Sequence, residues 1–254
     1  MSIATLSVIT VVYNSLGELE KTLESLRKQD LAGIEWVVVD GGSTDGSLEL
    51  IESVTDIEIK WISEKDNGIY DAMNKAIDLS TGKYLQFLNA GDIYHADDTL
   101  SEVIPILEES SFGIVFGAFE IWGKTVAEKI FHKAPRDFTL ENLKKFGTGV
   151  CNHQAFFILR SITPKYSNQY KLKGELNWYI DIASQNPPVT AKKLDQLTIV
   201  NYELGGAGNI NYRQNLYEWI QVTRRRFGLM QVIKSWRTYR NFIRYSKSMK
   251  RYYS

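Results

Sequence analysis

In the first third of the chain, apolar runs alternate with stretches whose apolar residues recur every three or four positions. The apolar runs are residues 6–13, 34–40, 57–63 and 83–89. The stretches with helical spacing are residues 15–29, 44–54 and 70–80. Short apolar runs favour buried strands, and the longer period favours amphipathic helices. Alternating strands and helices predict a mainly parallel, Rossmann-like central sheet with flanking helices.

The pattern changes after residue 98. The following segments are a helical stretch at 99–110, strand-like runs at 112–122, 124–131 and 151–159, a helix at 175–185 and an extended run at 191–203. The two runs before residue 132 favour an antiparallel pair. No internal repeat or Pro-rich linker interrupts the pattern. We therefore predict one α/β domain over residues 1–210, with halves at 1–98 and 99–210.

Residues 211–254 differ from this domain in charge. The chain has 30 basic and 30 acidic residues, yet 11 basic residues and a single acidic one, Glu218, follow residue 210. Helical spacing predicts an apolar and aromatic stripe of Leu229, Ile233, Trp236, Tyr239 and Ile243. The basic residues expected mainly on the other side are Arg237, Arg244, Lys247 and Arg251.

This basic amphipathic tail suits a helix that lies in an anionic membrane interface, because rings enter the headgroup region and cations meet lipid phosphate. We predict that residues 227–254 bind such a surface. The alternative is a helix packed on the domain or on a second subunit, so a homo-oligomer is also compatible with the sequence. No matching module supports a nucleic-acid role for these charges.

Composition limits the cellular compartments in which we expect the protein. The single cysteine, Cys151, excludes an intrachain disulfide and a cysteine-based zinc site, which makes a reducing compartment the default. The N-terminus lacks a basic segment of the kind that precedes a signal sequence, and no run of about 20 apolar residues occurs. We expect a cytoplasmic protein, either soluble or peripheral on the inner face of the cell membrane.

Polar residues follow each of the four early strands. The strand ends read YNS, VDGGSTDGS, SEKDNG and LNAGD. The last is the most abrupt, because an apolar strand leads directly into Asn89, Ala90, Gly91 and Asp92. Ligands of such sheets bind beyond the carboxyl ends of the strands, so these four tips predict a site.

Five ordered segments carry a resemblance to a known family. They are ITVVYNS, VVVDGGSTDGS, EKDNGIYDAMNKA, GKYLQFLNAGD and NHQAFF. Together they resemble family 2 glycosyltransferases of the GT-A fold, close to those that build bacterial capsule, O-antigen and exopolysaccharide. The resemblance implies an inverting enzyme that moves a sugar from a nucleoside diphosphate sugar to a glycan or polyprenyl-linked acceptor. The alternative is a catalytically silent protein that binds nucleotide sugars or glycans on the same fold.

The resemblance also implies a set of donor-binding residues. They are Thr10, Val12, Tyr13, Asn14, Asp40, Gly42, Asp66, Lys75, Asn89, Ala90 and Gly91. The Asp40 carboxylate can accept two hydrogen bonds from a base or ribose, although Asp40 and Ser43 could instead cap the next helix. Asp66 and Lys75 would lie near the sugar and diphosphate, although Lys75 could instead pair with Asp71 on its own helix.

In the family, the motif after the fourth strand binds Mg²⁺ or Mn²⁺ that bridges the donor phosphates. Here the motif is NAGD, with Asp92 in the last acidic position and with Asn89 and Gly91 where many relatives have carboxylates. The resemblance implies Asp92 as the metal ligand, with phosphate and water oxygens completing the shell. Asp97 and Asp98 fit better as the start of the next helix.

For the general base, the resemblance implies an acidic residue near the start of the helix after the NHQAFF segment. Glu175 matches that position, although the family usually has Asp there; Asp181 and a helix-capping role for Glu175 are the alternatives. His153, Gln154 and Trp178 would border the acceptor, with Trp178 stacking on a sugar. A histidine in an apolar run can equally be a core residue.

Overall fold

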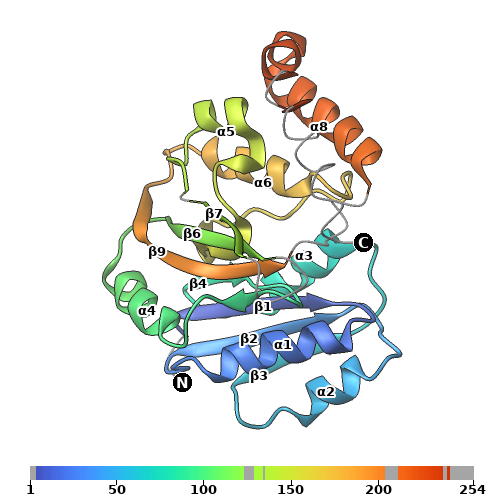
Figure 1. Ribbon diagram of the computed structural model, residues 1–254, viewed down its shortest axis with the longest axis vertical. Helices are drawn as coiled ribbons and strands as arrows, with labels where there is room; N and C mark the ends of the chain where they lie inside the picture. Colours follow the sequence, from blue (N-terminus) through green and yellow to red (C-terminus); the bar gives the residue numbers. More distant parts are fainter. Residues whose placement is uncertain (1–3, 123–128, 134, 204–210, 237–238, 241–254) are drawn as a thin grey trace.

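The computed structural model describes residues 4–122, 129–133, 135–203, 211–236 and 239–240. Its strands form one sheet with helices on both faces (Figure 1). The first four strands are β1 (Leu6–Val12), β2 (Ile34–Asp40), β3 (Ile59–Ser63) and β4 (Tyr84–Phe87). β1 pairs in parallel with β2 and β4, and β2 pairs in parallel with β3. The parallel arrangement predicted for this half is confirmed.

The second half of the chain completes the sheet with mixed directions. Its strands are β5 (Ile93–Tyr94), β6 (Ile114–Trp122), β7 (Lys129–Lys133), β8 (Phe156–Leu159) and β9 (Ala191–Glu203). The order is β3-β2-β1-β4-β8-β6-β9-β5, with β7 paired to β6. β8 is antiparallel to β4 and β6, β7 is antiparallel to β6 as predicted, and β9 is parallel to β6.

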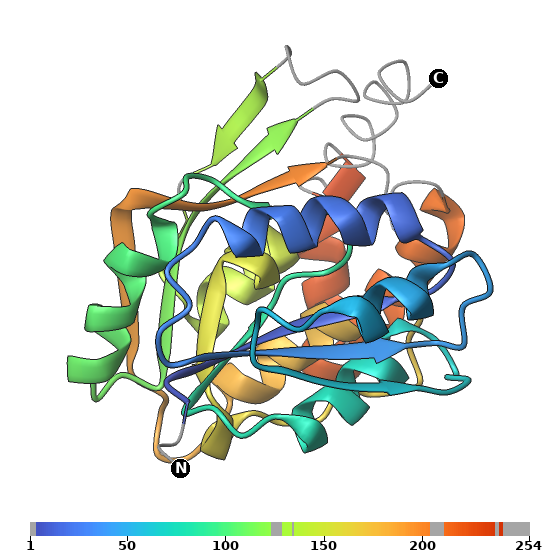
Figure 2. The same cartoon turned by 90° about the horizontal axis from the view of Figure 1, so that it is seen from below.

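The helices divide between the two faces of the sheet. One face carries α1 (Leu16–Arg27), α2 (Ser47–Ser53) and α4 (Thr99–Glu109). The other carries α3 (Ile69–Leu79), α5 (Leu140–Phe146), α6 (Gly174–Ala183) and α8 (Tyr212–Phe227). Figure 2, viewed from below, shows α1 and α2 in front of the sheet. Side chains of β1 alternate between the two cores: Val8 packs toward α1, and Ile9 packs toward α3.

α8 is joined to α6 by polar contacts as well as by apolar packing. The Glu218 carboxylate accepts hydrogen bonds from the backbone N–H groups of Lys171, Leu172 and Lys173 at 2.8–3.1 Å. Arg226 forms a 2.6 Å ion pair with Asp181 of α6. Because buried N–H groups need acceptors, Glu218 fixes the backbone from which α6 begins.

The residues after α8 do not form the single stripe that the sequence predicted. Residues 229–236 are helical, and Leu229 and Ile233 are each 60% exposed. Tyr239 is only 8% exposed and stacks on Trp219 of α8, with 4.1 Å between the ring centroids. The predicted stripe therefore does not share one surface: Tyr239 packs on α8, whereas Leu229 and Ile233 face solvent. Arg237, Ile243, Arg244, Lys247 and Arg251 lie outside the described residues. Within the described ranges, no helix is both long enough and apolar enough to cross a membrane.

Candidate active site

The loops after β1 and β2 are locked together at the carboxyl edge of the sheet. The Asn14 N–H donates to Oγ of Ser43 at 2.8 Å, and Asn14 Oδ1 accepts from the Thr44 N–H at 2.8 Å. In the described residues, Asn14 is the only non-glycine with positive φ, at 47°. This conformation is sparsely populated and needs support from the surroundings, which the reciprocal bonds to Ser43 and Thr44 supply.

Asp40 is fully buried and holds its own loop together. Its carboxylate accepts from the N–H groups of Gly42 and Ser43, from the Ser43 hydroxyl and from the Ser63 hydroxyl. Gly42 has a φ of +85°, which lets the chain turn back over the carboxylate. Neither Asp40 nor Ser43 caps α2, because α2 follows Gly46 and Asp45 accepts from the Ser47 N–H. The helix-capping alternative is therefore wrong.

Three tips meet around Gly41. A β-carbon added at Gly41 would lie 2.6 Å from Oδ2 of Asp66 and 3.2 Å from Cδ2 of Tyr13, so a side chain there would displace Asp66 and Tyr13 from their present positions. The Tyr13 side chain is 63% exposed. Asp66 accepts from the Gly68 N–H through Oδ1 at 2.8 Å. Tyr13 and Asp66 therefore border an open edge beyond β1, β2 and β3.

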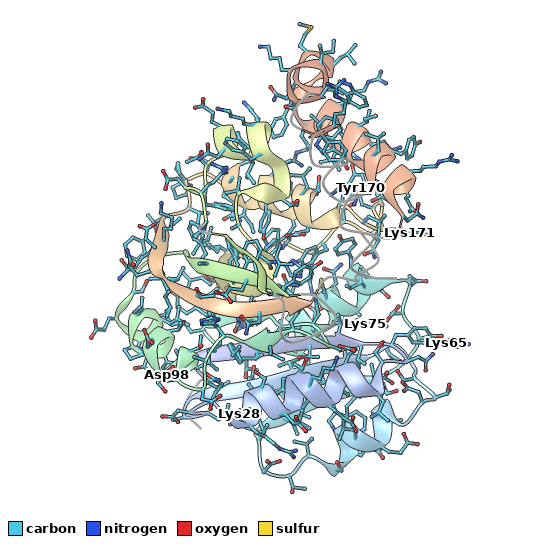
Figure 3. The ribbon with its side chains drawn as sticks, viewed as in Figure 1. Lys28, Lys65, Lys75, Asp98, Tyr170 and Lys171 are labelled. Carbon is cyan, nitrogen blue, oxygen red and sulfur yellow. The ribbon has the colours of Figure 1, made fainter. Side chains whose placement is uncertain are left out.

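Lys75 is held by the β3–α3 loop. Its ammonium group pairs with Glu64 at 2.8 Å, donates to the Lys65 carbonyl at 3.0 Å and lies 3.7 Å from Asp71. Glu64 raises the pKa of Lys75. Figure 3 shows Lys65 and Lys75 together at one edge of the molecule. The predicted pairing with Asp71 is thus present but longer than the one with Glu64.

Two of the predicted donor-binding side chains are part of the core. Thr10 is fully buried; its hydroxyl donates to the Leu88 carbonyl at 2.7 Å and accepts from Nε1 of Trp36 at 2.9 Å. Val12 is also buried, and its carbonyl accepts from the Gly41 N–H at 2.9 Å. Thr10 offers no free polar group to a ligand, so it acts by fixing the end of β4.

The turn after β4 explains the glycine in the NAGD motif. Asp92 donates its N–H to the Asn89 carbonyl, so Ala90 and Gly91 occupy the centre of the turn. Gly91 has a φ of +96°, and a β-carbon there would lie 2.7 Å from Oε2 of Glu18. Thus the side chain of Glu18, from α1, already fills the space into which a carboxylate at position 91 would extend.

We therefore expect Gly91→Asp, which restores the family's acidic pattern, to destabilise the protein without strengthening metal binding. A side chain forced into this backbone region costs about 1–3 kcal/mol, and the new carboxylate would also meet Glu18. Denaturant unfolding and Mn²⁺ titration measure the two effects. Gly91→Ala is the control for backbone strain alone. Unchanged stability with tighter Mn²⁺ binding would contradict the prediction.

Asp92 is buried beside the acceptor-side residues predicted from the sequence. Its side chain is 5% exposed, and Oδ2 accepts from Nε2 of Gln154 at 2.9 Å. Burial raises the pKa of Asp92 to about 7, against the opposite effects of Gln154 and His153. The side-chain oxygens Asn89 Oδ1 and Gln154 Oε1 are buried and have no hydrogen-bond partner in the described structure.

No group of three or more His, Cys, Asp or Glu side chains in the described residues could hold a metal ion. Asp92 therefore offers the single carboxylate of this turn. Hard divalent cations accept water and phosphate oxygens readily. The arrangement fits a cation only if a ligand brings further oxygen atoms with it.

His153 connects this turn to Glu175. Its Nδ1 lies 3.2 Å from Oε1 of Glu175, and its Nε2 lies 3.1 Å from Nδ2 of Asn89. Turning the Asn89 amide by 180° would place Oδ1 against this ring nitrogen, and a protonated His153 would then donate from both nitrogens. His153 is therefore a contact between the two predicted sites and more than a packed core residue.

Charge pairing between His153 and Glu175 favours the ionised form of each side chain. Burial lowers the pKa of His153, but the Glu175 carboxylate outweighs burial, so this pKa is raised overall. Burial also opposes ionisation of Glu175, yet the charge and hydrogen bond of His153, helped by Lys173, hold the pKa of Glu175 below its ordinary value. Glu175 is thus a carboxylate ready to accept a proton at neutral pH.

An aromatic wall supports the start of α6. Tyr70 accepts the Glu175 N–H at 3.3 Å and stacks on Tyr166, which in turn stacks on Trp178 at 4.9 Å between centroids. Trp178 is 0% exposed, and its indole N–H donates to the Pro164 carbonyl. It has no face free for a sugar, which corrects its predicted stacking role. Gly174 is required here because a β-carbon would lie 2.5 Å from the Tyr70 ring.

Asp181, the alternative base, has other partners. Its Oδ1 pairs with Arg226 at 2.6 Å, and its Oδ2 accepts from Asn177 at 2.8 Å. Both contacts hold Asp181 against α8 and α6, whereas Glu175 contacts His153. Asp181 therefore does not belong to the cluster that surrounds the turn after β4. The members of that cluster are Asn89, Asp92, His153, Gln154 and Glu175. Spacing in the sequence carries no signal for the His153–Glu175 contact.

Comparison with known proteins places this chain in a family. A family model described as glycosyl transferase family 2 matches residues 7–166. An uncharacterised glycosyltransferase of Mycobacterium tuberculosis is 32% identical over 197 residues, which cover 75% of this chain and 73% of the relative. A PGL/p-HBAD biosynthesis glycosyltransferase of Mycobacterium bovis is 29% identical over 210 residues, covering 80% and 78%.

Solved structures show the same fold. Staphylococcus aureus TarS 1–349 in complex with UDP has a TM-score of 0.61 at 18% identity, covering 83% of this chain and 63% of that one. The mannosyltransferase PcManGT of Pyrobaculum calidifontis, in complex with GDP-Man and Mn²⁺, has a TM-score of 0.61 at 17% identity, covering 86% and 62%. At these identities the likeness extends to the fold alone.

Proposed function

We propose, since the chain belongs to glycosyl transferase family 2 and is therefore a transferase enzyme, that it moves a sugar from a nucleoside diphosphate sugar to a hydroxyl group of a glycan or lipid-linked oligosaccharide. The transfer inverts the anomeric carbon. The observation that carries this proposal is the His153 side chain, which lies between Asn89 of the turn after β4 and Glu175 of α6.

The donor occupies the carboxyl edge of the parallel strands. This assignment is supported by the complexes of the structural neighbours with UDP and with GDP-Man and Mn²⁺. The exposed Tyr13 borders the nucleoside part, the Asp66 carboxylate lies near the sugar and diphosphate, and Asp40 shapes the loop beneath the nucleoside. Asp92 would hold Mg²⁺ or Mn²⁺ together with oxygens of the donor phosphates, and the cation would stabilise the charge of the leaving diphosphate.

Glu175 acts as the general base. The acceptor oxygen forms a bond to the anomeric carbon while the bond from that carbon to the diphosphate oxygen breaks, and the hydroxyl proton passes to Glu175. His153 keeps Glu175 ionised before this step and fixes the carboxylate beside the donor turn. One partly buried histidine therefore positions the base relative to the donor.

A panel of UDP- and GDP-sugars tests the proposal. Transfer or slow hydrolysis of at least one donor, with release of the nucleoside diphosphate, is the expected result. Tight binding of a nucleotide sugar with neither transfer nor hydrolysis, in the presence of Mn²⁺ and of candidate acceptors, would instead favour the silent binding protein.

We also place the enzyme on the inner face of the cell membrane. Support comes from the exposed residues Leu229, Met230 and Ile233, which lie next to exposed basic residues of α8 and its continuation, including Arg225 and Lys234. Apolar side chains beside cations suit an anionic interface, where each cation contributes about 1 kcal/mol. An enzyme placed there would share a surface with a lipid-linked acceptor.

Full-length protein is expected to bind anionic vesicles at low salt and to release them as salt rises. Binding should fall strongly in the Leu229→Ser/Met230→Ser/Ile233→Ser variant, which leaves Val232 and Tyr239 docked. Deleting residues 227–254 should abolish binding but also removes those docked residues. Vesicle sedimentation measures the effect, with neutral vesicles as control. Full-length protein that ignores anionic vesicles at low salt would refute this placement.

A further inference from the structure

A small cavity lies on the α8 side of α6, away from the turn after β4. It is bounded by α5 with the short 3-10 turn at 147–149, by the start of α6, and by α8 with the helical residues that follow it. Its volume is about 170 Å³. Pockets that enclose a whole drug-sized ligand measure about 300–1,000 Å³, so this cavity suits one small group of a larger molecule.

The lining of the cavity is strongly basic. Arg136, Lys144, Lys145 and Lys173 all contribute, and no Asp or Glu is among the described lining residues. The Arg136 guanidinium lies 4.0 Å from the centroid of the Phe146 ring, which orients it, and no carboxylate of the described residues forms an ion pair with it. A set of cations gathered around a concave surface attracts an anion.

Lys173 distinguishes the cavity from a patch of exposed basic residues, because its side chain is buried. It is buried at the start of α6, and its ammonium group lies 6.0 Å from the centroid of the Tyr239 ring. Burial lowers the pKa of Lys173, although Glu175 and Glu218 act in the opposite direction. An anion in the cavity would stabilise this buried charge.

The cavity also has a defined position relative to the general base. Lys173 and Leu176 line it, and Glu175 lies between them in the sequence. These residues fall within one helical turn, which rises 5.4 Å. The Glu175 carboxylate itself contacts His153, so a group bound in the cavity would lie on another side of the helical turn that carries the base, where part of an acceptor, and not the donor, would be held.

We propose that this cavity binds a phosphate or diphosphate group of the acceptor. The inference rests on the proposed function, because it assigns the anion to the acceptor. Phosphate suits the site since each group carries about one to two negative charges in a small volume, and arginine and lysine are its usual partners. The acceptor would thus be recognised by its phosphate as well as by the sugar that receives the transfer.

Calorimetric binding of inorganic pyrophosphate to the full chain tests whether the cavity binds an anion. Excess chelator is present to suppress metal-dependent sites. Lys144→Gln/Lys145→Gln should weaken binding at least tenfold. The matched control, Lys28→Gln/Lys192→Gln, removes the same charge elsewhere and should bind like the unmodified protein; Figure 3 shows Lys28 on the α1 side of the sheet, far from Lys171. Equal loss in both variants, or no loss in either, would overturn the proposal.

Vesicles distinguish a lipid phosphate from a soluble one. If the group belongs to a lipid, the cavity variant should lose binding to phosphatidic acid vesicles more than to phosphatidylserine vesicles of equal charge; loss with pyrophosphate alone assigns a soluble phosphate. Thermal unfolding and Mn²⁺-dependent UDP or GDP binding should match the unmodified protein in both variants. Because no sugar transfer is measured, failure here is separable from failure of the proposed glycosyl transfer.

Discussion

Replacing Glu175 with Gln should lower the turnover number by about 10²–10⁴-fold while leaving donor binding near normal, because an amide keeps the shape of the side chain but cannot accept the acceptor proton. Initial rates with a productive donor and titration of the nucleoside diphosphate measure the two quantities. Asp181→Asn is the matched control, since Asp181 pairs with Arg226 and not with His153. An active Glu175→Gln enzyme with an inactive Asp181→Asn enzyme would reverse the assignment.

The pH profile adds a readout that a purely structural role would not change. Catalysis needs ionised Glu175, whose pKa is held low by His153 and Lys173 against burial among Tyr70, Tyr166 and Tyr179. With donor and metal saturating, so that Asp92 stays ionised although burial raises its pKa to about 7 in the free protein, the turnover number should persist below the pH at which an ordinary glutamate becomes protonated. His153→Gln removes the cation, so the pKa of Glu175 rises and the acidic limb of kcat moves to higher pH. An acidic limb that stays in place would show that His153 does not tune the base.

Asp92→Ala should abolish the dependence of nucleoside diphosphate binding on Mg²⁺ or Mn²⁺. Asp92 is the carboxylate of the turn after β4, and no cluster of metal-binding side chains elsewhere in the described residues could replace it. A ligand at 100 times its Kd stabilises a protein by about 2.7 kcal/mol, so thermal unfolding with and without metal detects the loss directly.

Asp97→Ala provides the control for this metal experiment. Asp97 is an exposed carboxylate only five residues further along the chain, just before α4. The Asp97 variant should keep the full metal-dependent increase in unfolding temperature. If the unmodified protein binds the nucleoside diphosphate equally well in excess chelator, the metal role of Asp92 is wrong.

The sequence by itself determined the features that depend on local pattern. Apolar runs separated by helical spacing predicted the parallel strands β1 to β4, and five ordered segments indicated the family. Such features can be predicted from the sequence because the geometry of strands and helices decides which of the neighbouring residues are buried, and at what spacing. The same reasoning predicted that the four strand tips meet, since parallel strands end at one edge of the sheet.

Only the tertiary structure decided which residues at those tips are free to bind. The sequence suggested Thr10 as a donor ligand and the Trp178 ring as a surface for a sugar. In the structure both side chains are buried and hydrogen-bonded within the core. Conversely, Glu18 fills the space beside Gly91, and His153 reaches Glu175. The residues in these two contacts are more than 20 positions apart in the chain. Neither periodicity nor a short motif can therefore predict the contacts. They follow from the packing of α1 and α6 on opposite faces of one sheet, which brings distant side chains together at the end of β4.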